Sequence, residues 1–172
     1  MEIRKNEYSK GTVNSLEIRE SRKTDAAAMM EIENLVWTAS TTPGEIHFAS
    51  EAAFLLKNPP GTKKVAVIEG KAVGILGYHS PTSLTSNKHV WTFDIAVHPD
   101  YQKRGIGSAL LAELKRLATA EHIHKLSLRV LSNNEKAILL YKRAGFEVEG
   151  ILKQEFYLNG QFVDDVLMAY FL

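Results

Sequence analysis

The sequence predicts an α/β domain with a twisted, mostly antiparallel mixed sheet that carries helices on both of its faces. A strand, a turn and a long helix follow one another from His89 to about residue 120, and another strand comes next, which indicates a parallel crossover. Glycine turns at Gly70 and Gly160 each join two apolar, β-forming segments, which indicates antiparallel hairpins. The 172 residues contain neither a repeat nor a flexible linker, so we expect a single domain over residues 1–172.

The first half of the chain combines short strands with two helices, after a polar lead-in over residues 1–12. Thr24 and Ser50 each precede a helix-forming run, where a side-chain oxygen can accept from free backbone N–H groups. Thr38–Ser50 is dense in turn formers and predicts a loop over a site. The predicted elements are a strand around Leu16 and Ile18, a helix from the N-cap Thr24 through Glu33, a helix over Glu51–Lys57 capped by Ser50, and a hairpin of Lys64–Ile68 with Ala72–Tyr78.

The second half holds the longest periodic segments. Trp91, Phe93 and Ile95 share one face of a predicted strand, and apolar residues then recur at helical spacing. The predicted elements are a central strand over His89–Val97, a helix over about 106–120, a strand over Leu126–Val130, a helix opened by Asn133 and Asn134 and closed by Gly145, and a ribbon of Phe146–Leu158 with Gln161–Phe171.

Composition and charge exclude several classes of function. Lys and Arg number 21 and Asp and Glu 20, so the net charge of +1 gives no global field for nucleic acid or an anionic membrane. The chain has no cysteine, which excludes disulfides, thiolate zinc sites and a thiol nucleophile. The longest apolar run, Val166–Leu172, is far shorter than the roughly 20 residues of a membrane span. We expect a cytoplasmic protein that binds no metal, no nucleic acid and no membrane.

The segment Gln102–Ser108 is the clearest candidate for a binding site. Its two glycines let successive N–H groups point into one concavity, and the predicted helix that begins there adds its positive dipole end. The segment lacks the Lys-Ser/Thr of a Walker motif and the third glycine of a dinucleotide fingerprint. A diphosphate is the expected ligand, although the pattern by itself also fits an ordinary turn.

The flanking residues resemble two motifs of the GNAT superfamily of N-acetyltransferases. The run from Ile95 to Ser108 is similar to the family's acetyl-CoA motif, and the run from Asn134 to Phe146 matches a second signature through Ala137, Leu140, Tyr141 and Gly145. The resemblance implies a splayed central pair of parallel strands with acetyl-CoA as cosubstrate in the gap. The cofactor-binding residues that it implies are Ile95, Ala96, Val97, Gln102, Lys103, Arg104, Gly105, Ile106, Gly107, Ser108, Asn134 and Tyr141.

The implied chemistry is direct attack of an amine on a thioester in a ternary complex. Tyr141 is the expected catalytic acid for the departing thiolate, and the Val97 N–H the expected donor to the developing oxyanion. Asn134 and Tyr141 share a helix face, although a tyrosine in the core is the alternative interpretation. Asp94 is the first candidate for the catalytic base, followed by Glu155 and His47, and each is equally compatible with a structural role.

The C-terminal ribbon refines the resemblance within the superfamily. Its pattern through Lys153, Phe156, Asn159-Gly160, Asp164 and Met168 is similar to phosphinothricin and amino-acid N-acetyltransferases and to ribosomal-protein acetyltransferases. We expect loops Thr38–Ser50 and His79–Ser86 and the hairpin around Tyr157 to form the acceptor pocket. The expected partner is a small-molecule amine or a peptide N-terminus, and a homodimer stays open. The alternatives are a non-catalytic acyl-CoA sensor and, less favoured, a nucleic-acid binder.

Overall fold

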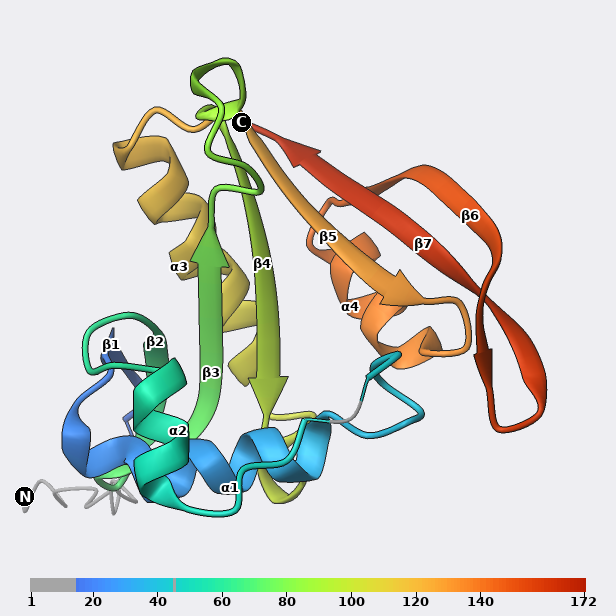
Figure 1. Cartoon of the computed structure of the whole chain (residues 1–172). Coiled ribbons are helices and arrows are strands. Elements are labelled where there is room, and N and C mark those ends of the chain that lie inside the picture. The colour runs from blue at the N-terminus through green and yellow to red at the C-terminus, as the bar shows by residue number, and fades with distance from the viewer. Residues whose placement is uncertain (1–14, 45) are drawn as a thin grey trace, which may run out of the picture.

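A computed structural model describes residues 15–44 and 46–172, in which seven strands form one sheet (Figure 1). The lead-in expected over residues 1–12 lies outside the described residues. The strands are β1 (Glu17–Glu20), β2 (Lys64–Ile68), β3 (Lys71–His79), β4 (Val90–Val97), β5 (Lys125–Leu131), β6 (Glu147–Leu158) and β7 (Gln161–Phe171). The α-helices are α1 (Ala26–Val36), α2 (Glu51–Lys57), α3 (Ile106–Ala120) and α4 (Glu135–Arg143), with 3-10 helices η1 (Lys23–Asp25), η2 (Thr85–Asn87) and η3 (Pro99–Tyr101).

The sheet has the order β1-β2-β3-β4-β5-β7-β6, and β4 and β5 form its parallel pair. They pair only over Val90–Thr92 and Lys125–Ser127, although β4 continues to Val97 and β5 to Leu131. Beyond that point the two strands diverge, and α1 crosses below the opening (Figure 1). The mixed, mostly antiparallel fold with a splayed central pair is therefore confirmed.

Two hydrophobic cores cover the two faces of the sheet. Leu110 and Leu114 of α3 belong to one core, and Met29 of α1 and Phe54 of α2 belong to the other. Strand β4 supplies both cores because successive side chains point to opposite faces: Phe93 and Ile95 join the first core and Ala96 joins the second. Asp94 therefore lies on the face that carries α1 and α2.

The observed elements follow the predicted ones closely. Ser50 caps α2 by accepting from the Ala53 amide at 3.2 Å, and Asn159 and Gly160 take the positive φ values of a tight hairpin turn. The prediction of Thr24 as the first helix cap was wrong, because Thr24 lies inside η1 and α1 starts after Asp25. The cause is Asp25, whose carboxylate accepts from the Arg22 amide at 2.7 Å and thereby forms an extra turn.

Asp25 also forms an ion pair with Arg19 that links α1 to β1. Two hydrogen bonds, of 2.7 and 2.9 Å, join the Arg19 guanidinium to a carboxylate that is 5% exposed. These bonds hold the pKa of Asp25 below its ordinary value, although burial acts in the opposite direction, and the Arg22 amide lowers it further.

We predict that Asp25→Asn lowers the free energy of unfolding by about 3 kcal/mol at neutral pH, because the guanidinium loses its charged partner. Since the folded-state pKa is depressed, this stabilisation is present above the ordinary pKa of about 4 and is lost as the pH falls below it. Urea titrations at several pH values measure the effect. Arg116→Gln, which removes an exposed pair with Glu113, is the control and leaves stability nearly unchanged; equal losses in both variants would contradict the prediction.

Candidate active site

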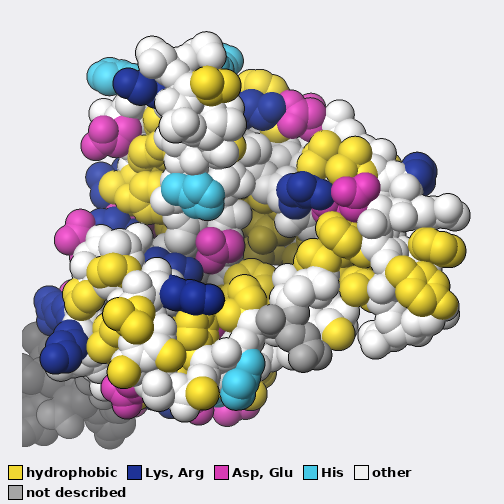
Figure 2. Space-filling view, in the orientation of Figure 1, with side chains coloured by type: hydrophobic (Ala, Val, Ile, Leu, Met, Phe, Trp, Pro, Cys, Tyr) yellow, Lys and Arg dark blue, Asp and Glu magenta, His cyan; other side chains and the backbone are white. Residues whose placement is uncertain are grey.

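The gap between β4 and β5 is the first component of the candidate site. At its apex the Ser127 hydroxyl donates to the Trp91 carbonyl at 3.2 Å, next to the last paired residues. Beyond the apex, within the described chain, the edge of β4 that faces β5 has no strand partner. Figure 2 shows the surface hollowed between the two halves of the molecule, with acidic side chains on either side.

The free edge of β4 presents backbone groups to this gap. The His98 amide donates to Val73 of β3 at 2.9 Å, so the N–H groups of Val97 and Ile95 point the other way, towards β5. The same alternation directs the backbone groups of Ala96 to β3. Of the three cofactor-binding residues expected on β4, two therefore present backbone groups to the gap.

The turn between β4 and α3 presents a row of free backbone donors. Lys103 and Gly105 have φ values of 61° and 80°, in the left-handed region. In the part of the chain that the structure describes, the amides from Lys103 to Ser108 donate no hydrogen bond, and the first helical bond joins Ala109 to Gly105 at 2.9 Å. Such a row at the positive end of a 15-residue helix matches the oxygen atoms of a diphosphate.

Gln102 braces this turn against β4. Its amide donates to Pro99 at 3.3 Å and its side chain donates to the Val97 carbonyl at 3.2 Å, so its own N–H is occupied. The guanidinium of Arg104 stacks 5.1 Å from the centre of the Tyr101 ring, and Lys103 is exposed. Gln102 therefore shapes the turn, whereas the free donors begin at Lys103.

A cavity of about 210 Å³ lies between α3 and α4, next to the turn that precedes α3. At Gly107 a Cβ atom would lie 3.1 Å from Leu140, so glycine allows the two helices to approach closely. The cavity places two cationic side chains next to Ser108 and can hold a further part of an anionic ligand. Its lining residues are Ser108, Leu111, Ala112, Lys115, Arg143 and Ala144.

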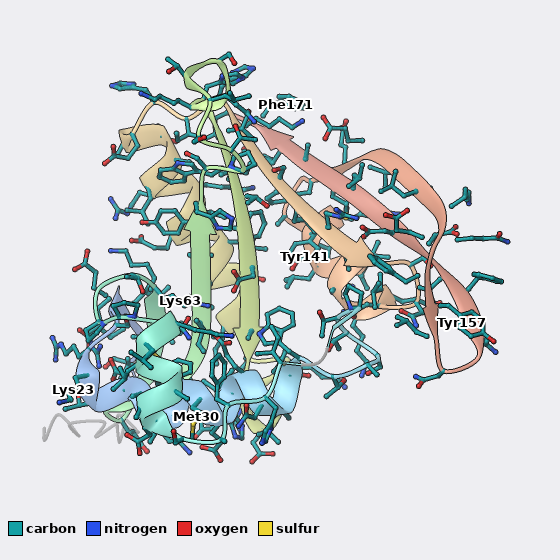
Figure 3. All side chains as sticks on the ribbon, in the orientation of Figure 1. Lys23, Met30, Lys63, Tyr141, Tyr157 and Phe171 are labelled. Carbon is teal, nitrogen blue, oxygen red and sulfur yellow. The ribbon has the colours of Figure 1, made fainter. Side chains whose placement is uncertain are left out.

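Tyr141 of α4 lies in the gap between β4 and β5 (Figure 3). Its side chain is buried, and its ring meets Phe93 edge-on with 6.0 Å between the ring centres. Among the described residues, the phenol oxygen has no hydrogen-bond partner. Burial raises the pKa of Tyr141 well above its ordinary value, and the Asp94 carboxylate raises it further. The phenol therefore keeps its proton at neutral pH and can donate it.

Asn134 caps the helix that carries Tyr141. Its side-chain oxygen accepts from the Ala137 amide at 3.3 Å, which leaves the side-chain NH₂ group available to a ligand. A cavity of about 340 Å³ lies where the loop after α1 meets this helix start, so this part of the predicted loop lies against the start of α4. Its lining residues are Ser40, Thr41, Asn133, Asn134, Glu135 and Lys136.

Asp94 belongs to a charged cluster that the sequence patterns above did not predict. Lys63 places its Nζ atom 2.9 Å from Glu33 and 3.6 Å from Asp94. Burial lowers the pKa of Lys63, but the two carboxylates outweigh burial and leave the pKa raised. Glu33 lies on the buried face of α1 with Met29, and a charged residue at that helical spacing was the available sequence signal.

The other candidates from the sequence are more scattered. Glu155 of β6 lies 3.8 Å from Arg129, which is also paired with the buried Asp165, and His47 is exposed. Tyr157 is 65% exposed at the tip of the β6–β7 ribbon and lies well away from Tyr141 (Figure 3). The acceptor pocket expected around Tyr157 is therefore not closed by this tip within one chain.

Residues 15–44 and 46–172 contain no group of three His, Asp or Glu side chains arranged to hold a metal ion. None of the helices described in this range is both long and apolar enough to cross a bilayer. The free amides, the open strand edge and the buried phenol together fit a long anionic ligand with a reactive end in the gap.

The acetyltransferase (GNAT) family profile matches residues 27–146, which include the turn, β4, β5 and Tyr141. The chain belongs to this family. Its N-acetyltransferase character is also borne out by curated relatives with that name.

Two of these relatives come from Escherichia coli strain K12. L-amino acid N-acetyltransferase AaaT is 35% identical over 116 residues, which cover 66% of this chain and 71% of AaaT. Spermidine N(1)-acetyltransferase is 39% identical over 80 residues, which cover 46% of this chain and 43% of that protein. The two names indicate different acceptors, and the chain spans less than half the length of the second relative.

Solved structures agree with the fold. The crystal structure of smu.2055 from Streptococcus mutans UA159 has a TM-score of 0.82 at 34% identity and covers 90% of this chain and 98% of that one. The structure of yncA from Salmonella typhimurium, solved with acetyl-CoA, has a TM-score of 0.80 at 24% identity and covers 92% and 95%. The second likeness concerns the fold alone.

Proposed function

We propose that this chain transfers the acetyl group of acetyl-CoA to the primary amine of a small metabolite, by direct attack in a ternary complex. The observation that carries the proposal is one continuous track: free amides from Lys103 to Ser108, the open edge of β4 and the buried phenol of Tyr141. A diphosphate, an extended amide arm and a thioester occur in this order along acetyl-CoA.

Each part of the track has a chemical task. The amides from Lys103 hold the diphosphate, and the N–H groups of Ile95 and Val97 align the arm and donate to the thioester oxygen. Bound acetyl-CoA supplies the acetyl group as a thioester. As the amine nitrogen bonds to the acetyl carbon and the carbon–sulfur bond breaks, the sulfur takes the proton of Tyr141. The nitrogen releases one proton to solvent as it becomes an amide, and Tyr141 recovers a proton from solvent.

The acceptor approaches from the side of Asp94. Its carboxylate is 41% exposed, and its negative charge raises the pKa of Tyr141. An amine with a pKa near 10 is mostly protonated at neutral pH and has to lose a proton before it attacks. Asp94 supports this step as the proton acceptor, directly or through one water molecule.

The test is calorimetry with acetyl-CoA, followed by thiol release with a panel of acceptors. We expect binding of acetyl-CoA and turnover with amines of the amino-acid or polyamine type, which the names of the two relatives suggest. A peptide with an N-terminal alanine completes the panel, because a ribosomal-protein-alanine acetyltransferase is 36% identical over 76 residues. Absence of binding would refute the proposal, and binding without thiol release would support a non-catalytic acyl-CoA sensor.

A further inference from the structure

Lys63 is a rigidly held cation beneath the acceptor side of the gap. It lies between α2 and β2, where the Ser21 amide donates to its carbonyl at 2.8 Å. Gly61, two residues earlier, donates to the Ser21 carbonyl at 2.8 Å and to its hydroxyl at 3.1 Å. The side chain of Lys63 is 17% exposed and lies beside α2 and β3 (Figure 3). Its backbone and its burial both restrict where the ammonium can go.

The ammonium of Lys63 forms ion pairs with two carboxylates that differ in exposure. Glu33 is 5% exposed and takes the shorter contact, at 2.9 Å, whereas Asp94 is 41% exposed and lies 3.6 Å away. A buried carboxylate needs a close counter-ion, so Lys63 and Glu33 form a neutral internal pair. Asp94 remains as the exposed anion of the cluster, and the fixed ammonium attracts its carboxylate from one side.

Gly77 leaves room for the same carboxylate on a second side. It pairs with Asp94 across β3 and β4, and a Cβ atom at Gly77 would lie 2.7 Å from Asp94 Oδ1 and 3.1 Å from Oδ2. The backbone φ of Gly77 is not in the left-handed region, so turn geometry does not require glycine there. What glycine provides is the space that the carboxylate occupies.

Asp94 is placed where the position of its carboxylate affects the chemistry. Thr92 and Ser127 are the last paired residues of β4 and β5, and Asp94 is the next residue of β4 on the same face, just past the apex. Its charge reaches the phenol of Tyr141. A shift of the carboxylate by about 1 Å therefore changes the geometry between the acceptor amine and the thioester.

We propose that Lys63 and Gly77 are positioning residues that fix the Asp94 carboxylate in the gap, where it receives the acceptor amine. The inference rests on the proposed function for the role of Asp94. It adds two residues from different segments, the turn before β2 and strand β3, and neither touches the substrate.

The test compares Lys63→Met, Lys63→Arg and Gly77→Ala with wild type in acceptor kinetics and in calorimetry with acetyl-CoA. We expect Lys63→Met and Gly77→Ala to lower kcat/KM for the acceptor about tenfold and to leave acetyl-CoA affinity unchanged within about threefold. Lys63→Arg keeps the charge and restores most of the activity. Lys71→Met, which removes an exposed lysine that pairs with Glu31 of α1 at 3.3 Å, and Gly150→Ala, whose Cβ makes an ordinary contact, are the matched controls and retain activity.

The decisive measurement repeats both changes in an Asp94→Asn background. If Lys63 and Gly77 act through Asp94, neither change lowers the rate further there; full additivity would overturn the inference. Should Lys63→Met fold poorly, Lys63→Met/Glu33→Gln removes the buried pair together and restores the charge balance of the cluster. Crystal structures of the variants test the inference without relying on turnover. An Asp94 carboxylate that has not moved in the variants would refute the positioning role. A wild type that acetylates no acceptor would refute the proposed function instead.

Discussion

Tyr141→Phe is expected to lower kcat for acetyl transfer about 100-fold, the lower range of a general-acid contribution. The change removes only the hydroxyl, so the ring keeps its contacts with Phe93 and Phe146, whose centres lie 6.0 Å away in each case. Affinity for acetyl-CoA, measured by calorimetry, should change little because the diphosphate and the arm are held by backbone groups. A loss of affinity with normal kcat would show that the phenol binds the cosubstrate rather than acting as an acid.

The raised pKa of Tyr141 adds a pH signature to this prediction. Burial disfavours the phenolate, and the Asp94 carboxylate disfavours it further, so the phenol stays protonated through the alkaline range. The wild type should therefore show no fall in kcat from ionisation of this group below about pH 10, the ordinary value for tyrosine. An alkaline limb that disappears in Tyr141→Phe would contradict this assignment.

Local patterns made most of the fold predictable. Ser50, Asn134 and Gly145 each act on backbone groups within a few residues of themselves, and the Asn159-Gly160 turn sets the register of its own hairpin. The turn from Lys103 to Ser108 is likewise contiguous in sequence, so its row of amides could be expected from the sequence alone.

Contacts between distant segments were the part that the sequence did not reveal. Lys63 is 30 residues from Glu33 and 31 from Asp94, and Arg129 is 36 from Asp165, so no spacing rule connects them. The displaced start of α1 has a local cause instead, because the carboxylate of Asp25 accepts from Arg19 and from the Arg22 amide, six and three residues earlier. Polar partners in a mixed sheet depend on strand order, and periodicity within a segment does not report strand order.

Gly105→Ala is expected to weaken acetyl-CoA binding at least 30-fold. A Cβ at this position meets no atom within 4 Å, so the change causes no clash, but its φ of 80° strains any other residue. The turn relieves the strain by rotating its peptide groups, and the amides from Lys103 to Ser108 then no longer converge on one anion. Calorimetry with acetyl-CoA, and with coenzyme A lacking the acetyl group, measures the loss.

A matched control separates binding from simple backbone strain. Gly70, in the turn between β2 and β3, has a φ of 79°, and a Cβ added there would also meet no atom within 4 Å, so Gly70→Ala introduces the same strain away from the site. Both variants should lose a similar amount of unfolding free energy, about 1 kcal/mol, while only Gly105→Ala loses affinity. Equal affinities for acetyl-CoA in the two variants would show that binding of the diphosphate does not depend on the conformation of this turn.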